Sequence, residues 1–224
     1  MKKLFLLFLP FFLFSCNSED VPQKPEKEQA EVTVWGYFVA DTNIKSDIRN
    51  NIKTMYEGLS KMDKQATLLI YWDGGSSDSY LESSPSIIRY TTDGYGNING
   101  LAARDSSYSI RFICEQAETV KAYPSQLSTD KDVMTSSLKD MKSFSPTEKI
   151  VFVAGSHGSA WWKNITASAK STRAFGQDGS NTENTITTPD MAEAIANAGV
   201  KLDLLLFDAC MMGTAEVCYD FRNV

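Results

Sequence analysis

Short apolar runs alternate with amphipathic stretches along residues 31–224, and two of these runs end at reactive side chains. Residues 151–153 lead to Ser156, His157 and Gly158, and residues 202–207 lead to Asp208, Ala209 and Cys210. Runs that stop at Gly or Asp are typical of buried parallel strands, and open α/β sheets gather their chemistry beyond the carboxyl ends of such strands. The pattern therefore predicts that the chain's only histidine and a cysteine share one rim of a sheet.

The remaining pattern predicts alternating strands and helices. Strands are expected at 32–40, 66–72, 149–154 and 201–207, and helices at 44–62, 129–142, 188–198 and 213–222. Thr188 is expected to cap the third helix, with Pro189 in its first turn. A loop and hairpin are expected at 76–108, strand-like pieces at 87–90 and 108–114, and a long loop at 158–187. The expected fold class is α/β, with a mainly parallel sheet, right-handed crossovers and flanking helices.

The first thirty residues are expected to lie outside the fold. Lys2 and Lys3 precede an apolar stretch at 4–14, which has the layout of a secretory signal and is too short to span a bilayer. The next residues, Ser15 and Cys16, resemble the lipobox of bacterial lipoproteins, in which the cysteine is acylated and becomes the mature first residue. Ordinary signal-peptidase cleavage is the alternative. Residues 17–30 predict a solvated tether, and their acidic start resembles surface lipoproteins of Gram-negative bacteria, so we expect an anchor at the outer membrane or cell surface.

Composition and charge narrow the classes of function. Hydrophobic residues make up 42% of the chain and charged residues 22%, as in an ordinary globular domain. The formal net charge of -6, with no basic cluster beyond the signal, argues against a nucleic-acid partner. After Cys16 the cysteines are Cys114, Cys210 and Cys218, an odd number that leaves at least one thiol unpaired. Cys114, in a strand, and Cys218 are expected to be core residues, and no cysteine spacing fits a zinc site.

A cysteine beside a histidine has a specific chemical use. The thiolate is the nucleophile, and a neighbouring imidazole takes the thiol proton and later donates it to the leaving amine. The backbone N–H groups of Cys210 and Gly158 are candidates for an oxyanion hole. An inert core residue is the alternative for Cys210, because cysteine is among the most buried residue types. The residues alone leave both open.

Two longer motifs carry a family resemblance. The segments Ser156-His157-Gly158-Ser159-Ala160-Trp161 and Asp208-Ala209-Cys210-Met211-Met212-Gly213 resemble the clostripain family of cysteine peptidases. The resemblance covers 31–224, is most specific from residue 150 onward, and departs at Ala160, where the family commonly has Gly. It implies a fold like that of caspases and hemoglobinases. Because clostripain-like domains continue beyond the position of Val224, we expect the catalytic domain to be incomplete.

The resemblance also implies roles for single residues. It implies a secreted endopeptidase in which Cys210 is the nucleophile and His157 the general base and acid. Asp208 would select Arg or Lys at P1, since a carboxylate pairs well with a guanidinium; a turn or helix cap is its alternative role. Trp161 is expected to line the substrate cleft, with packing under the loop as the alternative.

Maturation and partners follow from the same resemblance. The family often cuts itself between base and nucleophile, where Lys170 and Arg173 lie within a loop expected at 163–187. Some members use calcium, for which Asp178, Asn181 and Glu183 are candidates without the spacing of an EF-hand; no other cofactor or metal is expected. Peptide or protein substrates with a basic P1 residue, and the membrane through the lipid, are the expected partners. The alternative function is a non-catalytic surface lipoprotein that binds peptides or host protein.

Overall fold

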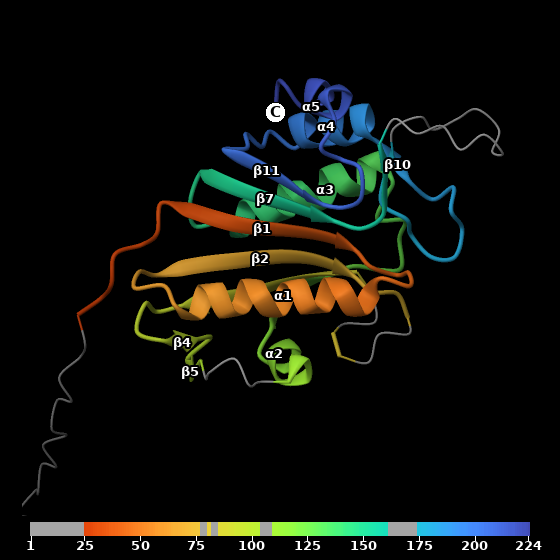
Figure 1. Ribbon diagram of the computed structural model, residues 1–224. Helices are drawn as coiled ribbons and strands as arrows, with labels where there is room; N and C mark the ends of the chain where they lie inside the picture. Colours follow the sequence, from red (N-terminus) through yellow and green to blue (C-terminus); the bar gives the residue numbers. More distant parts are fainter. Residues whose placement is uncertain (1–24, 77–79, 82–84, 104–108, 161–173) are drawn as a thin grey trace, which may run out of the picture.

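One mixed sheet runs through the computed structural model, which describes residues 25–76, 80–81, 85–103, 109–160 and 174–224 (Figure 1). Its strand order is β11-β7-β1-β2-β3-β4-β5, with β6 paired to β3. The strands are β1 Val32–Val39, β2 Ala66–Asp73, β3 Ser86–Thr92, β4 Asn97–Ile98, β5 Leu101–Ala102, β6 Glu118–Ala122, β7 Lys149–Gly155 and β11 Leu204–Asp208. β11, β7, β1 and β2 are parallel, whereas β3 to β6 pair antiparallel. The parallel core confirms the predicted fold class.

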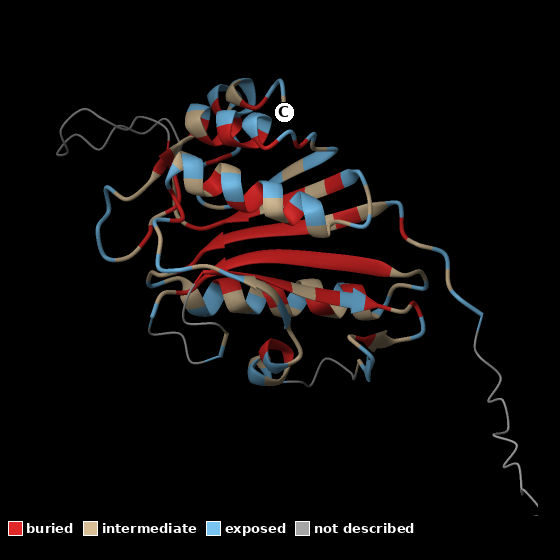
Figure 2. Ribbon diagram, turned by 180° about the vertical axis from the view of Figure 1, so that it is seen from behind, coloured by how far each residue is buried: buried red, intermediate tan, exposed pale blue. Residues whose placement is uncertain are grey.

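Helices cover both faces of this sheet. They are α1 Lys45–Ser60, α2 Ile110–Glu115, α3 Lys131–Phe144, α4 Thr188–Asn197 and α5 Ala215–Asp220. α1 and α2 pack on one face, and α3, α4 and α5 pack on the other (Figure 1). Along β1, Tyr37 belongs to the core under α3 and Phe38 to the core under α1, because successive strand residues point to opposite faces. β2 is buried along its whole length, as expected for a strand covered on both sides (Figure 2).

β11 is only half buried, and the prediction of a buried strand there is wrong. Its residues pair in register with β7, Leu204 with Val151 and Asp208 with Gly155. In the described part of the chain β11 forms one edge of the sheet. Phe207 packs on the core under α4 and α5, whereas Leu204 and Leu206 remain 48% and 46% exposed.

Two segments differ from the predicted elements. Residues 110–115 form helix α2 instead of a strand, because the side chain of Ser109 accepts a hydrogen bond from the Phe112 N–H and caps the helix. The expected long loop at 158–187 contains, in its described parts, a small antiparallel sheet. Its strands are β8 Gly158–Ala160, β9 Ala174–Phe175 and β10 Ile186–Thr187, in the order β10-β9-β8. β8, before residues 161–173, therefore pairs with β9, after them. Residues 161–173 themselves lie outside the described residues.

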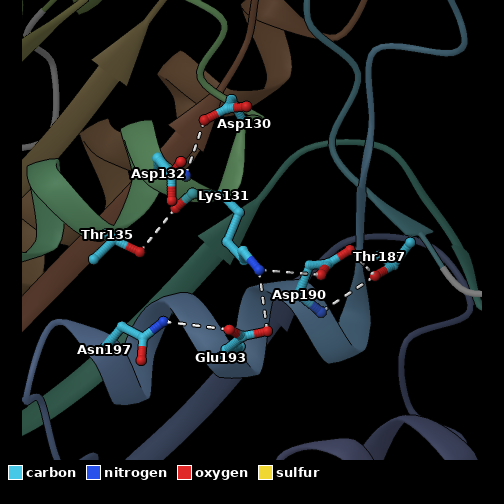
Figure 3. A network of polar contacts seen from close by, with 8 residues as sticks. All are labelled: Asp130, Lys131, Asp132, Thr135, Thr187, Asp190, Glu193 and Asn197. Atoms are coloured by element: carbon cyan, nitrogen blue, oxygen red, sulfur yellow. Dashed lines mark hydrogen bonds and ion pairs between the residues drawn. The ribbon is translucent and has the colours of Figure 1, made fainter.

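Polar contacts join the first turn of α3 to α4 (Figure 3). Lys131 of α3 lies 3.1 Å from Glu193 and 3.8 Å from Asp190 on α4. Thr187, one residue before the predicted cap Thr188, caps α4 by accepting from the Asp190 N–H. Because these ion pairs are exposed to solvent they contribute little, and apolar packing holds the two helices together.

The folded part begins slightly before residue 31. Gln29 forms an isolated bridge with Gln65, and Ala30 is buried, so the end of the expected tether joins the sheet. Cys16 and the signal stretch lie outside the described residues. Among residues that are described, no helix is both long and apolar enough to cross a membrane.

Candidate active site

His157 and Cys210 leave the sheet at the same rim. They follow β7 and β11, whose last residues, Gly155 and Asp208, pair in register. The Ser156 N–H continues this pairing beyond the strands by donating to the Asp208 carbonyl oxygen at 3.4 Å. The common rim expected from the sequence is present. Within the described residues no hydrogen bond joins the side chains of His157 and Cys210.

The turns that carry His157 and Cys210 touch at Gly158. A Cβ on Gly158 would overlap the carbonyl oxygen of Cys210 and lie 2.9 Å from Cγ of Met212. Glycine is needed here because a side chain would push the two turns apart. Met211 has a φ of 62°, a left-handed conformation that costs a non-glycine residue about 1–2 kcal/mol. This reversal follows directly after Cys210, whose side chain is exposed.

Hydrogen bonds hold the backbone around His157. Ser156 Oγ donates to the Val39 carbonyl oxygen at 2.6 Å and accepts from the Gln177 N–H at 3.2 Å. The Gly176 N–H donates to the His157 carbonyl oxygen at 2.8 Å. β9 pairs with β8 directly after His157. The position of His157 therefore depends on β1 and on the segment that follows residues 161–173.

Two asparagines near the start of α1 contact side chains of the rim. Asn43, in the connection between β1 and α1, places Oδ1 2.9 Å from Nε2 of His157. Asn51, on α1, donates through Nδ2 to Oδ2 of Asp208. Neither asparagine was predicted. Helical periodicity identifies the apolar face of α1 and does not distinguish among its polar positions, such as Asn51. The position of Asn43 just beyond the carboxyl end of β1 was the available signal.

Asp208 is exposed at the end of β11, two residues before Cys210. Its carboxylate accepts the hydrogen bond from Asn51, and its expected role in binding a basic P1 residue stays a prediction. Trp161, Lys170 and Arg173, the other residues expected to bind substrate or to be cut, lie outside the described residues.

Cys210 and Cys218 have exposed, free thiols. Cys114 is buried as predicted, although in helix α2 and not in a strand. Cys218 is exposed, so its prediction as a core residue is wrong: α5 packs on the sheet through Val217 and Phe221 instead.

The residues considered for calcium form hydrogen bonds within the chain. Asp178 turns inward and accepts from the Ser128 N–H at 2.6 Å; burial, with Asp73 nearby, raises the pKa of Asp178 to about 6. Asn181 accepts from the Glu183 N–H, which closes a local turn. Across the described ranges, no group of at least three His, Cys, Asp or Glu residues is arranged to hold a metal ion. Calcium dependence stays a prediction.

The mostly parallel sheet with helices on both faces is a caspase-like fold, shared with C11 cysteine proteases. The family model Peptidase C11, described as Clostripain family, matches residues 36–224. The chain belongs to the clostripain family.

Individual relatives agree with this assignment. Clostripain of Hathewaya histolytica is 25% identical over 219 residues, which are 92% of this chain and 39% of clostripain. A secreted C11 cysteine protease from Bacteroides thetaiotaomicron, solved with an irreversible peptide inhibitor, is 26% identical with a TM-score of 0.61, over 87% of this chain and 46% of the protease. An inactive zymogen C11 protease from Parabacteroides distasonis shares the fold, with a TM-score of 0.60 at 22% identity over 88% and 46% of the two chains. The chain spans less than half the length of each of these three relatives.

Proposed function

We propose that this chain is the part of a secreted cysteine endopeptidase that carries the catalytic dyad, and that it cleaves after Arg or Lys. The observation that carries the proposal is the placement of His157 and Cys210 on the paired ends of β7 and β11, with their turns in contact at Gly158. Membership of the clostripain family supports the same reaction.

The dyad chemistry uses residues of these two turns. His157 takes the proton of the Cys210 thiol, and the thiolate attacks the scissile carbonyl carbon. The backbone N–H groups of Cys210 and Gly158 stabilise the resulting oxyanion. When the carbon–nitrogen bond breaks, His157 gives its proton to the leaving amine, and a thioester with Cys210 remains. Water then hydrolyses the thioester, with His157 again as the base.

Asp208 supplies the preference for a basic P1 residue. Its exposed carboxylate lies at the same rim as Cys210, where a P1 guanidinium or ammonium forms a charge-assisted hydrogen bond. An uncharged P1 residue leaves this carboxylate uncompensated, which disfavours such substrates.

Hydrolysis of fluorogenic peptides by the full chain tests the proposal. We expect cleavage after Arg and Lys but not after Leu, and complete loss of cleavage in Cys210→Ala. Cys218→Ala is the matched control, because its thiol is also exposed and free. Independently, iodoacetamide at about pH 6 should alkylate Cys210 faster than Cys218 if an imidazole activates the thiol. Binding of basic peptides without hydrolysis, and equal alkylation of the two thiols, would favour the non-catalytic binder.

The buried start of β9 supports self-cleavage after Lys170 in preference to Arg173. A cut after Arg173 would use Ala174 and Phe175 as P1′ and P2′, and these residues are 4% and 0% exposed and paired within the small sheet. A protease binds the residues on both sides of the scissile bond in an accessible, extended form. Lys170 lies three residues further from β9, so a cut there leaves the pairing intact.

Lipid attachment at Cys16 completes the proposed location at the outer membrane or cell surface. The proposal rests on the signal-like stretch and the lipobox resemblance. Mass spectrometry of the mature N-terminus tests it: a diacylated or triacylated Cys16 is expected, and an unmodified terminus elsewhere would point to ordinary signal-peptidase cleavage.

A further inference from the structure

We infer that Asn43 is a positioning residue for His157, which fixes the imidazole so that Nδ1 receives the proton from Cys210. The observation is the 2.9 Å contact between Asn43 Oδ1 and His157 Nε2. The chemical meaning of this contact rests on the proposed dyad, whereas the contact itself is testable without catalysis.

The contact selects one form of the neutral imidazole. A carbonyl oxygen only accepts hydrogen bonds, so the ring nitrogen that faces it carries the hydrogen. With Nε2 protonated, the free lone pair of neutral His157 is on Nδ1. When Nδ1 takes the thiol proton, Nε2 keeps its hydrogen and Asn43 still accepts it. The same contact is therefore present with the neutral imidazole and with the imidazolium of His157.

The backbone around Asn43 is tied to the same strand end that holds the His157 turn. The Thr42 N–H donates to the Ala40 carbonyl oxygen at 2.7 Å, and the Ala40 N–H donates to Asp73 of β2 at 2.7 Å. Just before them, the Val39 carbonyl oxygen accepts from Ser156 Oγ. The end of β1 thus fixes both partners, so the contact is built before substrate binds.

Asn43 is the hydrogen-bond partner of the His157 ring within the part of the chain that the structure describes. Asn43 is exposed and His157 is half-buried, so water competes for the imidazole N–H once the amide is removed. Loss of the contact should therefore misorient His157 without unfolding the chain. Misplacement of a reacting group by about 1 Å costs on the order of 100-fold in rate, so we expect Asn43→Ala to lower kcat about 10- to 100-fold with little change in KM.

Nuclear magnetic resonance of the imidazole nitrogens is the primary test. His157 is the only histidine, so a chain without a histidine tag and with isotope-labelled histidine gives one pair of ring-nitrogen signals. We expect a protonated Nε2 with an observable attached proton in the wild type. That proton should exchange faster, and its signal disappear, in Asn43→Ala, whereas Asn43→Asp keeps an acceptor and retains the signal. A protonated Nδ1 in the wild type, or the same Nε2–H signal in Asn43→Ala, would overturn the inference.

Kinetics separate this inference from the proposed function. If the chain hydrolyses Arg peptides, Asn43→Ala should lower kcat and Asn43→Asp should restore most of it. Asn50→Ala is the control, because Asn50 is exposed on α1 and contacts neither His157 nor Asp208 through its side chain. If the wild type does not hydrolyse peptides but the nuclear magnetic resonance signals behave as expected, only the proposed function is contradicted. Normal kcat in Asn43→Ala contradicts only the inference.

Discussion

The carbonyl oxygen of Cys210 lies so close to the Cα of Gly158 that no side chain fits between them. This contact joins the turn of Cys210 to the turn of His157, since His157 directly precedes Gly158. The relative position of the two turns is therefore set by backbone packing and by the β7–β11 register.

Gly158→Ala should separate the two turns. A new methyl group against a backbone carbonyl has no low-cost relaxation, so we expect a stability loss of about 1–3 kcal/mol. We also expect a fall in kcat/KM for Arg peptides of at least about 10-fold, because the dyad is displaced. Urea unfolding and peptide hydrolysis measure the two effects.

Gly58→Ala is the matched control for this substitution. Gly58 lies in α1 with open space around its Cα, so alanine there should stabilise the helix by about 0.5–1 kcal/mol and leave hydrolysis unchanged. Equal behaviour of the two variants would show that the contact of Gly158 with Cys210 does not constrain the site.

Asp208→Asn should remove the preference for basic P1 residues. Asparagine keeps an oxygen that accepts from Asn51, so the local hydrogen bond survives while the charge is lost. We expect kcat/KM for Arg and Lys peptides to fall by about 100-fold or more, and the low rate for Leu peptides to change little. Asp63→Asn, at an exposed position after α1, is the charge control. If the ratio of kcat/KM for Arg and Leu peptides is unchanged in Asp208→Asn, Asp208 has only a structural role in the turn.

The rim of the site was predictable because it depends on strand order and strand ends. The apolar runs before His157 and Cys210 mark those ends, and parallel neighbours bring them together. The contact of Asn43 with His157 was not predictable in this way, since it depends on the path of an irregular connection.

Burial was less predictable than strand position. The exposure of Leu204 depends on which strands lie beside β11, and the sequence of β11 does not carry that information. Similarly, the apolar segment at 110–115 has the pattern of a strand but forms helix α2, whose N-terminus is capped by the side chain of Ser109. In both cases the deciding interaction lies outside the apolar run itself.

Asp178 should make stability depend on pH. Burial, with Asp73 and Asp41 nearby, raises the pKa of Asp178 to about 6, and burial also raises the pKa of Asp73. A raised pKa means that the folded state binds the proton more tightly than the unfolded state does. The cost of ionising Asp178 is therefore fully present above about pH 6 and disappears as the pH falls towards about 4.

Asp178→Asn isolates this effect. The amide keeps an oxygen for the Ser128 N–H and never ionises. We expect its Tm to exceed that of the wild type at about pH 8, and the difference to shrink towards about pH 4.5. Asp63→Asn, at an exposed position, is the control for loss of one negative charge. A constant Tm difference across this range would mean that the carboxyl ionises without cost in the fold.

Self-cleavage should stop in Lys170→Gln and continue in Arg173→Gln. The reason is the burial of Ala174 and Phe175, which would have to leave the small sheet for a cut after Arg173. Intact mass and N-terminal sequencing of the fragments identify the cut, and Cys210→Ala, which lacks the proposed nucleophile, should remain one chain. The fragments should elute together without denaturant, since β8 and β9 stay paired and Phe175 stays in the core. A cut that disappears only in Arg173→Gln would show that β9 detaches from the small sheet during maturation. In that case the His157 carbonyl oxygen would lose its hydrogen bond from the Gly176 N–H while the peptide bond after Arg173 is cut.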